Sequence, residues 1–286
     1  MPAARRILTC LLGLGLWCAA RAEVRPETLP GLTFGDLPPR EVWVYVPPGG
    51  VTVATPVLVV LDGQMMAAWR LEETLTALAA QGRVAVPLVV AIAAGEGRSD
   101  EYGLAGLPDF AGRGGKAAAF ERFVLETVLP AVRQRYGVPA GDPARTGVMG
   151  ASQGGLVAFD LAWRHADVFG FAGIFSGSFW WRSDNATPVT RQASRLALHL
   201  ADRPGRPPRV RLWFEAGTSD ETDDRDGNGV IDAIQDTTEL MDVLARRGLR
   251  RGPDLTYVEV AGGRHNETTW AAVLPRFLEW ALPPAR

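Results

Sequence analysis

The sequence predicts an α/β protein in which helices cover both faces of a mainly parallel central sheet. Apolar runs rich in β-branched residues alternate with helical patterns along most of the chain. Two of these runs, "VLVVLDG" (Val57–Gly63) and "VPLVVAIAAG" (Val86–Gly95), are almost wholly apolar, as strands buried on both faces are. No linker or repeat divides the 286 residues. We therefore expect one domain over residues 23–286.

The individual elements follow from the same patterns. The segment "EVWVYV" alternates in polarity like a half-buried strand. The strands are expected at Glu41–Val46, Val57–Gly63, Val86–Gly95, Arg145–Gly150, Gly170–Gly177, Val210–Gly217 and Leu255–Gly263. Helical patterns lie around Met65–Ala80, Ala117–Tyr136, Gln153–His165, Pro188–Ala201, Thr237–Arg247 and Thr268–Ala281. Thr187 before Pro188 is typical of a helix start. Alternation of this length favours parallel strands joined by helical crossovers.

The first 22 residues read as a secretory signal peptide. Two arginines precede an apolar stretch, Ile7–Trp17, and a small-x-small site follows at Ala20–Ala22. Cleavage after Ala22 would remove both cysteines, Cys10 and Cys18. An uncleaved anchor is the alternative, but the apolar stretch is short for a bilayer span. We expect a periplasmic or secreted protein with no stable membrane insertion after cleavage. A formal net charge of −2 gives no reason to expect a nucleic-acid partner.

One short segment contains a serine between small residues and glycines, a pattern typical of a reactive turn. "GASQG" (Gly150–Gly154) fits the pattern G-x-S-x-G and lies between an expected strand and an expected helix. In that context the pattern is typical of a nucleophile elbow, a tight turn that exposes a serine hydroxyl at the end of a strand. The glycines leave room for strand and helix to approach. Ser152 is therefore the candidate nucleophile, against the alternative of a glycine-rich packing turn.

A serine nucleophile needs a base and a carboxylate to orient that base. Of the three histidines, only His265 follows the last strand, where the chain order of this arrangement requires the base. The carboxylate is expected just past the penultimate strand, where Asp220 and Glu221 are both available, and we favour Asp220. Glu215 is expected within the strand itself. The backbone N–H groups of Gln64, after "LDG", and of Gln153 are the expected oxyanion donors.

Several spaced segments resemble the putative-esterase family of α/β hydrolases, which includes enterochelin esterases, feruloyl esterases, S-formylglutathione hydrolase and mycolyltransferases. The matching segments are "VWVYVPP", "VVLDGQ", "RSDEY", "VLPAVRQRYG", "GVMGASQGGLVAF", "FSGSFWW", "EAGTSDE" and "GGRHNETTW". The resemblance implies an α/β-hydrolase fold, Ser152 as nucleophile, His265 as base, and the amides of Gln64 and Gln153 as oxyanion donors. It leaves the acid open, because enterochelin- and feruloyl-type relatives have it at the Asp220 position and mycolyltransferases at Glu221.

The predicted activity is hydrolysis of a small-molecule carboxylic ester through an acyl-enzyme, with no cofactor required. The segment "SGSFWW" looks most like the enterochelin esterase branch. Trp180 and Trp181 follow an expected strand at the edge where α/β sheets bind ligands. Because neighbours in an extended segment alternate faces, at least one should form a wall for bulky aryl, siderophore-type or carbohydrate-linked esters. Packing of both under a loop is the alternative.

Two other readings of the function stay open. An acyltransferase would use the same triad with an alcohol or sugar acceptor in place of water. A non-catalytic secreted binding protein on a hydrolase scaffold is disfavoured, because every triad position is filled.

The segment "DDRDGNGVIDAIQD" (Asp223–Asp236) resembles a calcium loop. Asp224, Asp226, Asn228 and Asp232 occupy positions one, three, five and nine of that template. Position twelve is Gln235, where a full loop has a bidentate Glu. A structural calcium that braces the acid loop is therefore a hypothesis, and a solvated acidic turn is its alternative.

Overall fold

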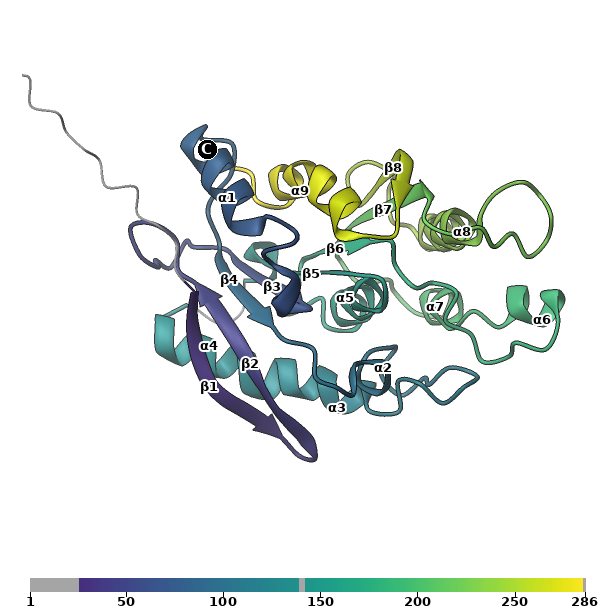
Figure 1. The fold of residues 1–286 in the computed structure, drawn as a ribbon, viewed down its shortest axis with the longest axis horizontal. Coiled ribbons are helices and arrows are strands. Elements are labelled where there is room, and N and C mark those ends of the chain that lie inside the picture. Colours follow the sequence, from purple (N-terminus) through teal and green to yellow (C-terminus); the bar gives the residue numbers. More distant parts are fainter. Residues whose placement is uncertain (1–25, 139–141, 285–286) are drawn as a thin grey trace, which may run out of the picture.

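The computed structural model describes residues 26–138 and 142–284, so the signal-peptide prediction and both cysteines lie outside the described residues. Eight strands form one sheet in the order β1-β2-β4-β3-β5-β6-β7-β8 (Figure 1). They are β1 (Pro26–Phe34), β2 (Leu37–Tyr45), β3 (Val57–Leu61), β4 (Leu88–Ile92), β5 (Thr146–Ala151), β6 (Phe171–Phe175), β7 (Arg211–Ser219) and β8 (Leu255–Arg264).

The sheet is mainly parallel, as the sequence predicts. Strands β4, β3, β5, β6, β7 and β8 all run parallel to one another. Strand β1 was not predicted from the sequence; it forms an antiparallel hairpin with β2, and β2 pairs antiparallel with β4. A strand that contains prolines and a glycine lacks the β-branched pattern that marks the others, and it lies at the edge of the sheet, where proline is tolerated.

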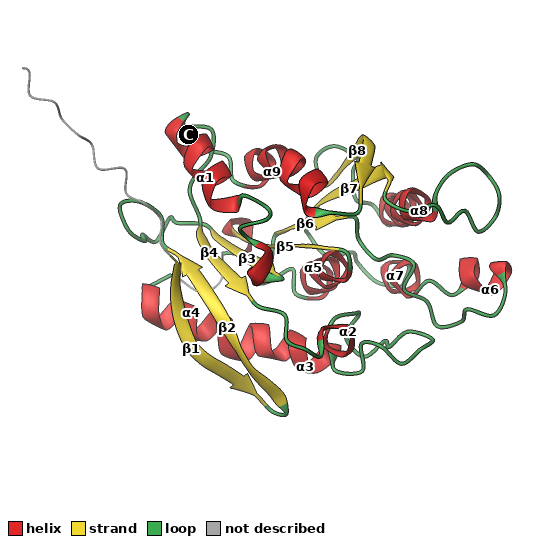
Figure 2. Cartoon of the chain, viewed as in Figure 1, coloured by secondary structure: helices red, strands yellow, loops and turns green. Residues whose placement is uncertain are grey.

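Helices cover both faces of the sheet (Figure 2). The helical segments are η1 (Gly63–Met65), α1 (Leu71–Ala80), α2 (Arg98–Glu101), α3 (Ala117–Arg122), η2 (Phe123–Val128), α4 (Leu129–Tyr136), η3 (Pro143–Arg145), α5 (Gln153–Arg164), α6 (Pro188–Ala193), α7 (Leu196–Ala201), α8 (Asp232–Arg246) and α9 (Glu267–Ala281). Helices α1 and α9 pack with Leu58 and Val60 of β3 on one face. Helices α3, α4, α5, α7 and α8 pack with Val57 and Val59 on the other. Alternate residues of one strand thus enter two cores, which explains why the strand is apolar throughout.

Three helix boundaries differ from the sequence-based predictions. Helix α8 begins at Asp232 and not at Thr237. Helix α1 begins at Leu71, because Arg70 has a left-handed backbone (φ 55°) that separates it from the short turn η1. The expected helix Pro188–Ala201 is two helices, with a break where Arg195 adopts an extended backbone (ψ 113°). The predicted start of α6 is confirmed, because Thr187 caps it with a capping box.

The expected helix Ala117–Tyr136 is continuous but contains a π-helical segment, η2, in its middle. Pro130 follows this segment and has no backbone N–H to donate into the helix. The i→i+5 hydrogen bonds of a π-helical segment just before the proline allow its ring to fit within the helix. Among the residues that the structure describes, no helix is both long enough and apolar enough to cross a membrane.

Candidate active site

Ser152 lies in a sharp turn between β5 and α5, at the carboxyl edge of the parallel strands. Its backbone is left-handed in φ (φ 56°, ψ −126°), which is strained for any residue with a side chain. Gly150 and Gly154 make the turn sterically feasible. A Cβ atom on Gly150 would lie 2.5 Å from the carbonyl oxygen of Gly154, closer than real contacts permit. The spacing of the two glycines in the sequence thus reflects a direct strand–helix contact.

The turn is held by the neighbouring strand β6 and the loop after it. The backbone N–H of Ser152 donates to the carbonyl oxygen of Phe175 at 2.9 Å, and the N–H of Ser178 donates to the carbonyl oxygen of Ser152 at 3.1 Å. The hydroxyl oxygens of Ser152 and Ser178 are 3.5 Å apart. Ser152 itself stays partly exposed. Its hydroxyl is therefore fixed in place yet accessible to a small molecule.

Asp220 and His265 lie beside each other at the ends of β7 and β8. Both oxygens of the Asp220 carboxylate are buried and have no hydrogen-bond partner among the described residues. Burial raises the pKa of Asp220, and the Ser176 hydroxyl and the His265 imidazole oppose that rise. Partial burial lowers the pKa of His265, and the Asp220 charge opposes that fall. A buried carboxylate close to an imidazole can accept a hydrogen bond from a ring N–H.

Glu221, the alternative acid, lies in different surroundings. Burial raises its pKa to about 7, and the charges of Asp232, Asp223 and Asp236 add to the rise. These carboxylates belong to the loop before α8 and to the first turns of that helix. The electrostatic surroundings therefore associate Glu221 with the acidic loop and Asp220 with His265.

The other two histidines have partners of their own. The Nε2 atom of His165 lies 3.3 Å from Glu121, and that of His199 lies 2.7 Å from the carbonyl oxygen of Ala193. His265 instead packs edge-on against Trp270, with ring centroids 5.3 Å apart. The described residues show no hydrogen bond between Ser152 and His265. Catalytic hydrogen bonds are often loose before substrate binds, so this geometry is compatible with a base.

The two expected oxyanion donors lie at the ends of neighbouring strands. Gln64 is in the turn η1 after β3, and Gln153 is the first residue of α5 after β5. Neither backbone N–H donates to another described residue. The side chains are occupied: Gln64 Oε1 accepts from Ala94 N–H at 3.0 Å, and Gln153 Oε1 accepts from Arg98 at 2.9 Å. Two free N–H groups at one edge of the sheet are available for an anionic oxygen.

Glu215 lies within β7, as the sequence predicts, and contacts Ser176 at the end of β6. Its side chain is fully buried in β7, and one oxygen accepts from the Ser176 hydroxyl at 3.4 Å. The Ser176 oxygen in turn accepts from the indole N–H of Trp270 at 2.9 Å. Burial raises the pKa of Glu215 to about 8, and the charge of Asp220 adds to the rise. Glu215 therefore holds a proton at neutral pH.

The two tryptophans have different positions. Trp181 is fully buried, and its indole N–H donates to the carbonyl oxygen of Leu107 at 2.9 Å. This position is packing under a loop, so the expectation that Trp181 forms an open wall for substrate is not met. Trp180 is half-buried, and the guanidinium of Arg113 stacks over its ring at 4.9 Å. The hypothesis of an aromatic wall now depends on Trp180.

The calcium hypothesis does not fit the loop as folded. Asp232 Oδ1 lies 3.0 Å from the Arg225 guanidinium and accepts from the Arg225 backbone N–H at 3.0 Å. Asp224 accepts from the backbone N–H groups of Asn228 and Gly229. In the described ranges, no group of three or more His, Cys, Asp or Glu side chains is arranged to hold a metal ion. An arginine inside the loop replaces the charge that a cation would supply.

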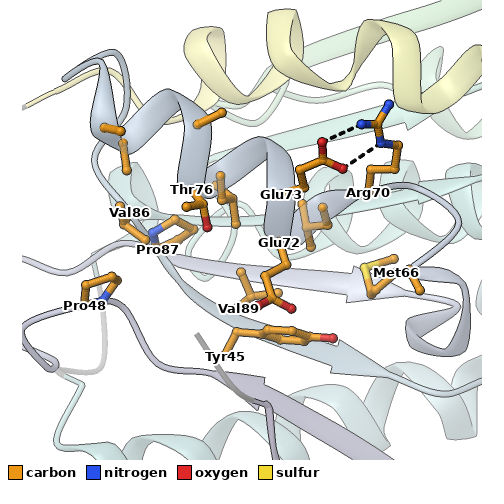
Figure 3. A pocket seen from close by; sticks show the side chains of 16 residues that line it. Tyr45, Pro48, Met66, Arg70, Glu72, Glu73, Thr76, Val86, Pro87 and Val89 are labelled. Atoms are coloured by element: carbon orange, nitrogen blue, oxygen red, sulfur yellow. Dashed lines mark hydrogen bonds and ion pairs between the residues drawn. The ribbon is translucent and has the colours of Figure 1, made fainter. Parts of the chain in front are cut away.

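A cavity of about 920 Å³ lies elsewhere, between α1 and strands β2 and β4 (Figure 3). Tyr45 lies along its floor, and an ion pair between Arg70 and Glu73 lies at its rim. Its lining includes neither Ser152 nor His265. The cavity is therefore separate from the candidate active site.

Comparison with known proteins identifies the family of the chain. The family described as "Putative esterase" matches residues 38–281 of the chain. The chain belongs to this family. The predicted resemblance and the α/β-hydrolase fold are thereby confirmed. Among curated proteins, no sequence matches this member of the family.

Solved structures share the fold of this family member. The enterobactin esterase from Shigella flexneri, crystallised in the presence of 2,3-di-hydroxy-N-benzoyl-serine, is 22% identical, with a TM-score of 0.69. The match covers 91% of this chain and 59% of that chain, so this chain spans little more than half of that enzyme's length. A ferulic acid esterase is 18% identical over 91% of this chain and 98% of that chain (TM-score 0.63). The siderophore hydrolase EstB from Aspergillus nidulans is 19% identical over 99% of this chain and 100% of that chain (TM-score 0.63).

Proposed function

We propose that this member of the esterase family is a serine esterase in which Ser152 is the nucleophile, His265 the base and Asp220 the acid. The observation that carries the proposal is the position of Asp220 beside His265, at the same edge of the sheet as the strained Ser152 turn. In a parallel sheet the carboxyl ends of all strands meet at one edge, so residues far apart in the sequence converge there. The surroundings of Glu221 favour Asp220 for this role, because the charges that act on Glu221 are those of Asp232, Asp223 and Asp236.

The mechanism follows from these positions. His265 takes the proton from the Ser152 hydroxyl as the serine oxygen attacks the ester carbonyl. The N–H groups of Gln64 and Gln153 stabilise the oxygen anion that develops, and the protonated His265 returns the proton to the leaving alcohol. Water then attacks the acyl-enzyme with His265 again as base. Asp220 holds the imidazole orientation and stabilises its positive charge.

The proposed substrates are bulky aryl or siderophore-type esters. The half-buried ring of Trp180 and the guanidinium of Arg113 stacked over it offer a flat surface that favours aromatic groups. The structural neighbours named for enterobactin, ferulic acid and siderophores act on aromatic or siderophore compounds by name, which supports the same class here. Export to the periplasm or the medium, directed by residues 1–22, belongs to this proposal.

A labelling experiment tests the proposed function. A fluorophosphonate probe should label the purified protein at Ser152, and the protein should hydrolyse p-nitrophenyl esters. Ser152→Ala should abolish both, whereas Ser178→Ala, which removes the neighbouring hydroxyl, should keep the labelling. Product analysis with added alcohols separates hydrolysis from acyl transfer. Labelling at another residue, or full turnover by Ser152→Ala, would contradict the proposal.

A further inference from the structure

Arg98, the first residue of α2, connects the two turns that carry the candidate oxyanion donors. Its guanidinium binds the Asp62 carboxylate through two parallel hydrogen bonds, Nε to Oδ1 at 2.7 Å and Nη2 to Oδ2 at 2.8 Å. Its remaining nitrogen, Nη1, donates to Gln153 Oε1 at 2.9 Å. Asp62 directly precedes the turn with Gln64, and Gln153 begins the helix after Ser152. One side chain therefore contacts both turns.

Both turns have strained backbones that need support. Asp62 is left-handed (φ 56°, ψ 48°), and so in φ is Ser152 (φ 56°). Neither is a glycine, so each conformation persists only where surrounding contacts hold it. The two turns end the neighbouring parallel strands β3 and β5. Their relative position sets the distance between the N–H groups of Gln64 and Gln153.

Arg98 is itself held rigidly. Its guanidinium lies over the ring of the fully buried Tyr102, 4.8 Å from the centroid. The Tyr102 hydroxyl oxygen accepts from the Asp62 N–H at 3.2 Å, so Asp62 is fixed at both its backbone and its side chain. Helix α2 is anchored by a buried ion pair, Glu101 with Arg40 of β2, at 2.7 Å. The contacts thus run without a break from β2 to the two turns.

We propose that Arg98 is a positioning residue that holds the turns after β3 and β5 at the separation that a tetrahedral oxyanion requires. Only a planar fork can bind the Asp62 carboxylate with two nitrogens and Gln153 with the third, so lysine cannot replace it. Arg98 acts through Asp62 and Gln153 and not on the substrate. The inference rests on the proposed function, because it assumes that the two N–H groups receive an oxyanion.

The experiment compares Arg98→Lys, Arg98→Gln and Gln153→Leu with the wild type. Gln153→Leu removes one contact of Arg98 and leaves the backbone N–H in place. Arg250→Gln is the matched control, because Arg250 also forms a bidentate pair, with Asp254 at 2.8 and 3.0 Å, but away from the site. The readouts are kcat and KM for a p-nitrophenyl ester, the inhibition constant of an arylboronic acid, which forms a tetrahedral adduct, and the melting temperature.

The expected result is a lower kcat with little change in KM. Arg98→Lys and Arg98→Gln should lower kcat about 10- to 100-fold, somewhat less than the loss of an oxyanion donor itself, with KM within about threefold. The inhibition constant of the boronic acid should rise in proportion to the loss of kcat. Gln153→Leu should show a smaller effect in the same direction, and Arg250→Gln none. If the Arg98 variants fail to fold, Gln153→Leu decides the outcome.

Several outcomes would overturn the inference. Arg98→Lys with wild-type kcat would mean that charge alone suffices, and a rise in KM without loss of kcat would mean that Arg98 binds substrate. A loss of kcat with an unchanged inhibition constant of the boronic acid would show that Arg98 does not contribute to stabilisation of the oxyanion. If the wild type reacts with fluorophosphonate at Ser152 but the Arg98 and Gln153 variants keep full kcat, only this inference fails. If the wild type neither reacts nor hydrolyses esters, the proposed function fails and this inference with it.

Discussion

Asp220 and His265 each follow directly on one residue of a paired register, Ser219 of β7 and Arg264 of β8. The two residues therefore follow the ends of neighbouring strands, although 45 positions separate them in the sequence (265 minus 220). Just before that pair the register shifts, because β7 advances two residues, from Gly217 to Ser219, while β8 advances four, from Val260 to Arg264. This pairing of strand ends accounts for the effect of the Asp220 charge, which opposes the lowering of the His265 pKa by burial.

Loss of the base should be as severe as loss of the nucleophile. We expect His265→Ala and Ser152→Ala each to lower kcat by about 10⁴-fold or more, because the two groups act as a unit. The double variant should be little worse than either single one. The measurement is the steady-state rate on a p-nitrophenyl ester, with circular dichroism as the control for folding. If the loss of kcat in the double variant equals the product of the two single losses, the two residues act independently.

The two candidate acids should differ sharply. Asp220→Asn should lower kcat about 10³- to 10⁴-fold, because the amide no longer supports the imidazolium or its tautomer. Glu221→Gln should change kcat less than about threefold, since its neighbours are the carboxylates of the acidic loop. Rates of the two isosteric variants under one set of conditions make the comparison. The opposite ranking would move the acid to Glu221.

Glu215 should make the protein less stable as the pH rises. Its folded-state pKa is about 8, above the ordinary value of 4.5, so its contribution to stability is fully present below about pH 4.5 and is lost as the pH rises through 8. At most about 5 kcal/mol is involved, since one pKa unit corresponds to about 1.4 kcal/mol. Urea unfolding of Glu215→Gln should therefore show a flatter pH dependence between pH 5 and 9. The exposed Glu96→Gln is the control; if it flattens the curve equally, Glu215 is not the cause.

The two tryptophans should respond differently to truncation. Trp180→Ala should reduce the preference for feruloyl or catechoyl esters over acetyl esters, in kcat/KM, by about 2- to 10-fold, as the loss of one stacking surface predicts. Trp181→Ala should instead lower the free energy of unfolding by about 3–5 kcal/mol, because it empties a fully buried site. Ester panels and denaturant unfolding give the two readouts. An unchanged preference in Trp180→Ala would show that Trp180 does not select the substrate.

Chelation should leave the protein unchanged. Arg225 already pairs with Asp232 and with the buried Asp236, at 3.0 and 2.6 Å, so the loop has its own cation. We expect EDTA and added calcium each to shift the melting temperature by less than about 1 °C, because a ligand stabilises only in proportion to its binding. Removal of the arginine in Arg225→Met should destabilise the fold, since it leaves buried carboxylates unpaired. A calcium-dependent rise in melting temperature would restore the calcium hypothesis.

The sequence by itself determined the parts of this protein that depend on local pattern. Continuous apolar runs such as Val57–Leu61 predict buried parallel strands because both of their faces meet helices. The spacing of Gly150, Ser152 and Gly154 predicts the strained turn because no other residues fit between β5 and α5. The position of His265 after the last strand follows from chain order alone.

Only the tertiary structure decided what depends on convergence. It gave the two adjacent carboxylates different surroundings, because the Asp220 charge affects His265 whereas Glu221 lies among the carboxylates near α8. It buried Trp181 under the loop with Leu107, paired Asp232 with Arg225, and joined Asp62 to Gln153 through Arg98. Asp220 was already favoured from the sequence, but the contacts of Trp181, Asp232 and Arg98 were not. These contacts arise from packing in three dimensions, and no periodicity or spacing in the sequence encodes them.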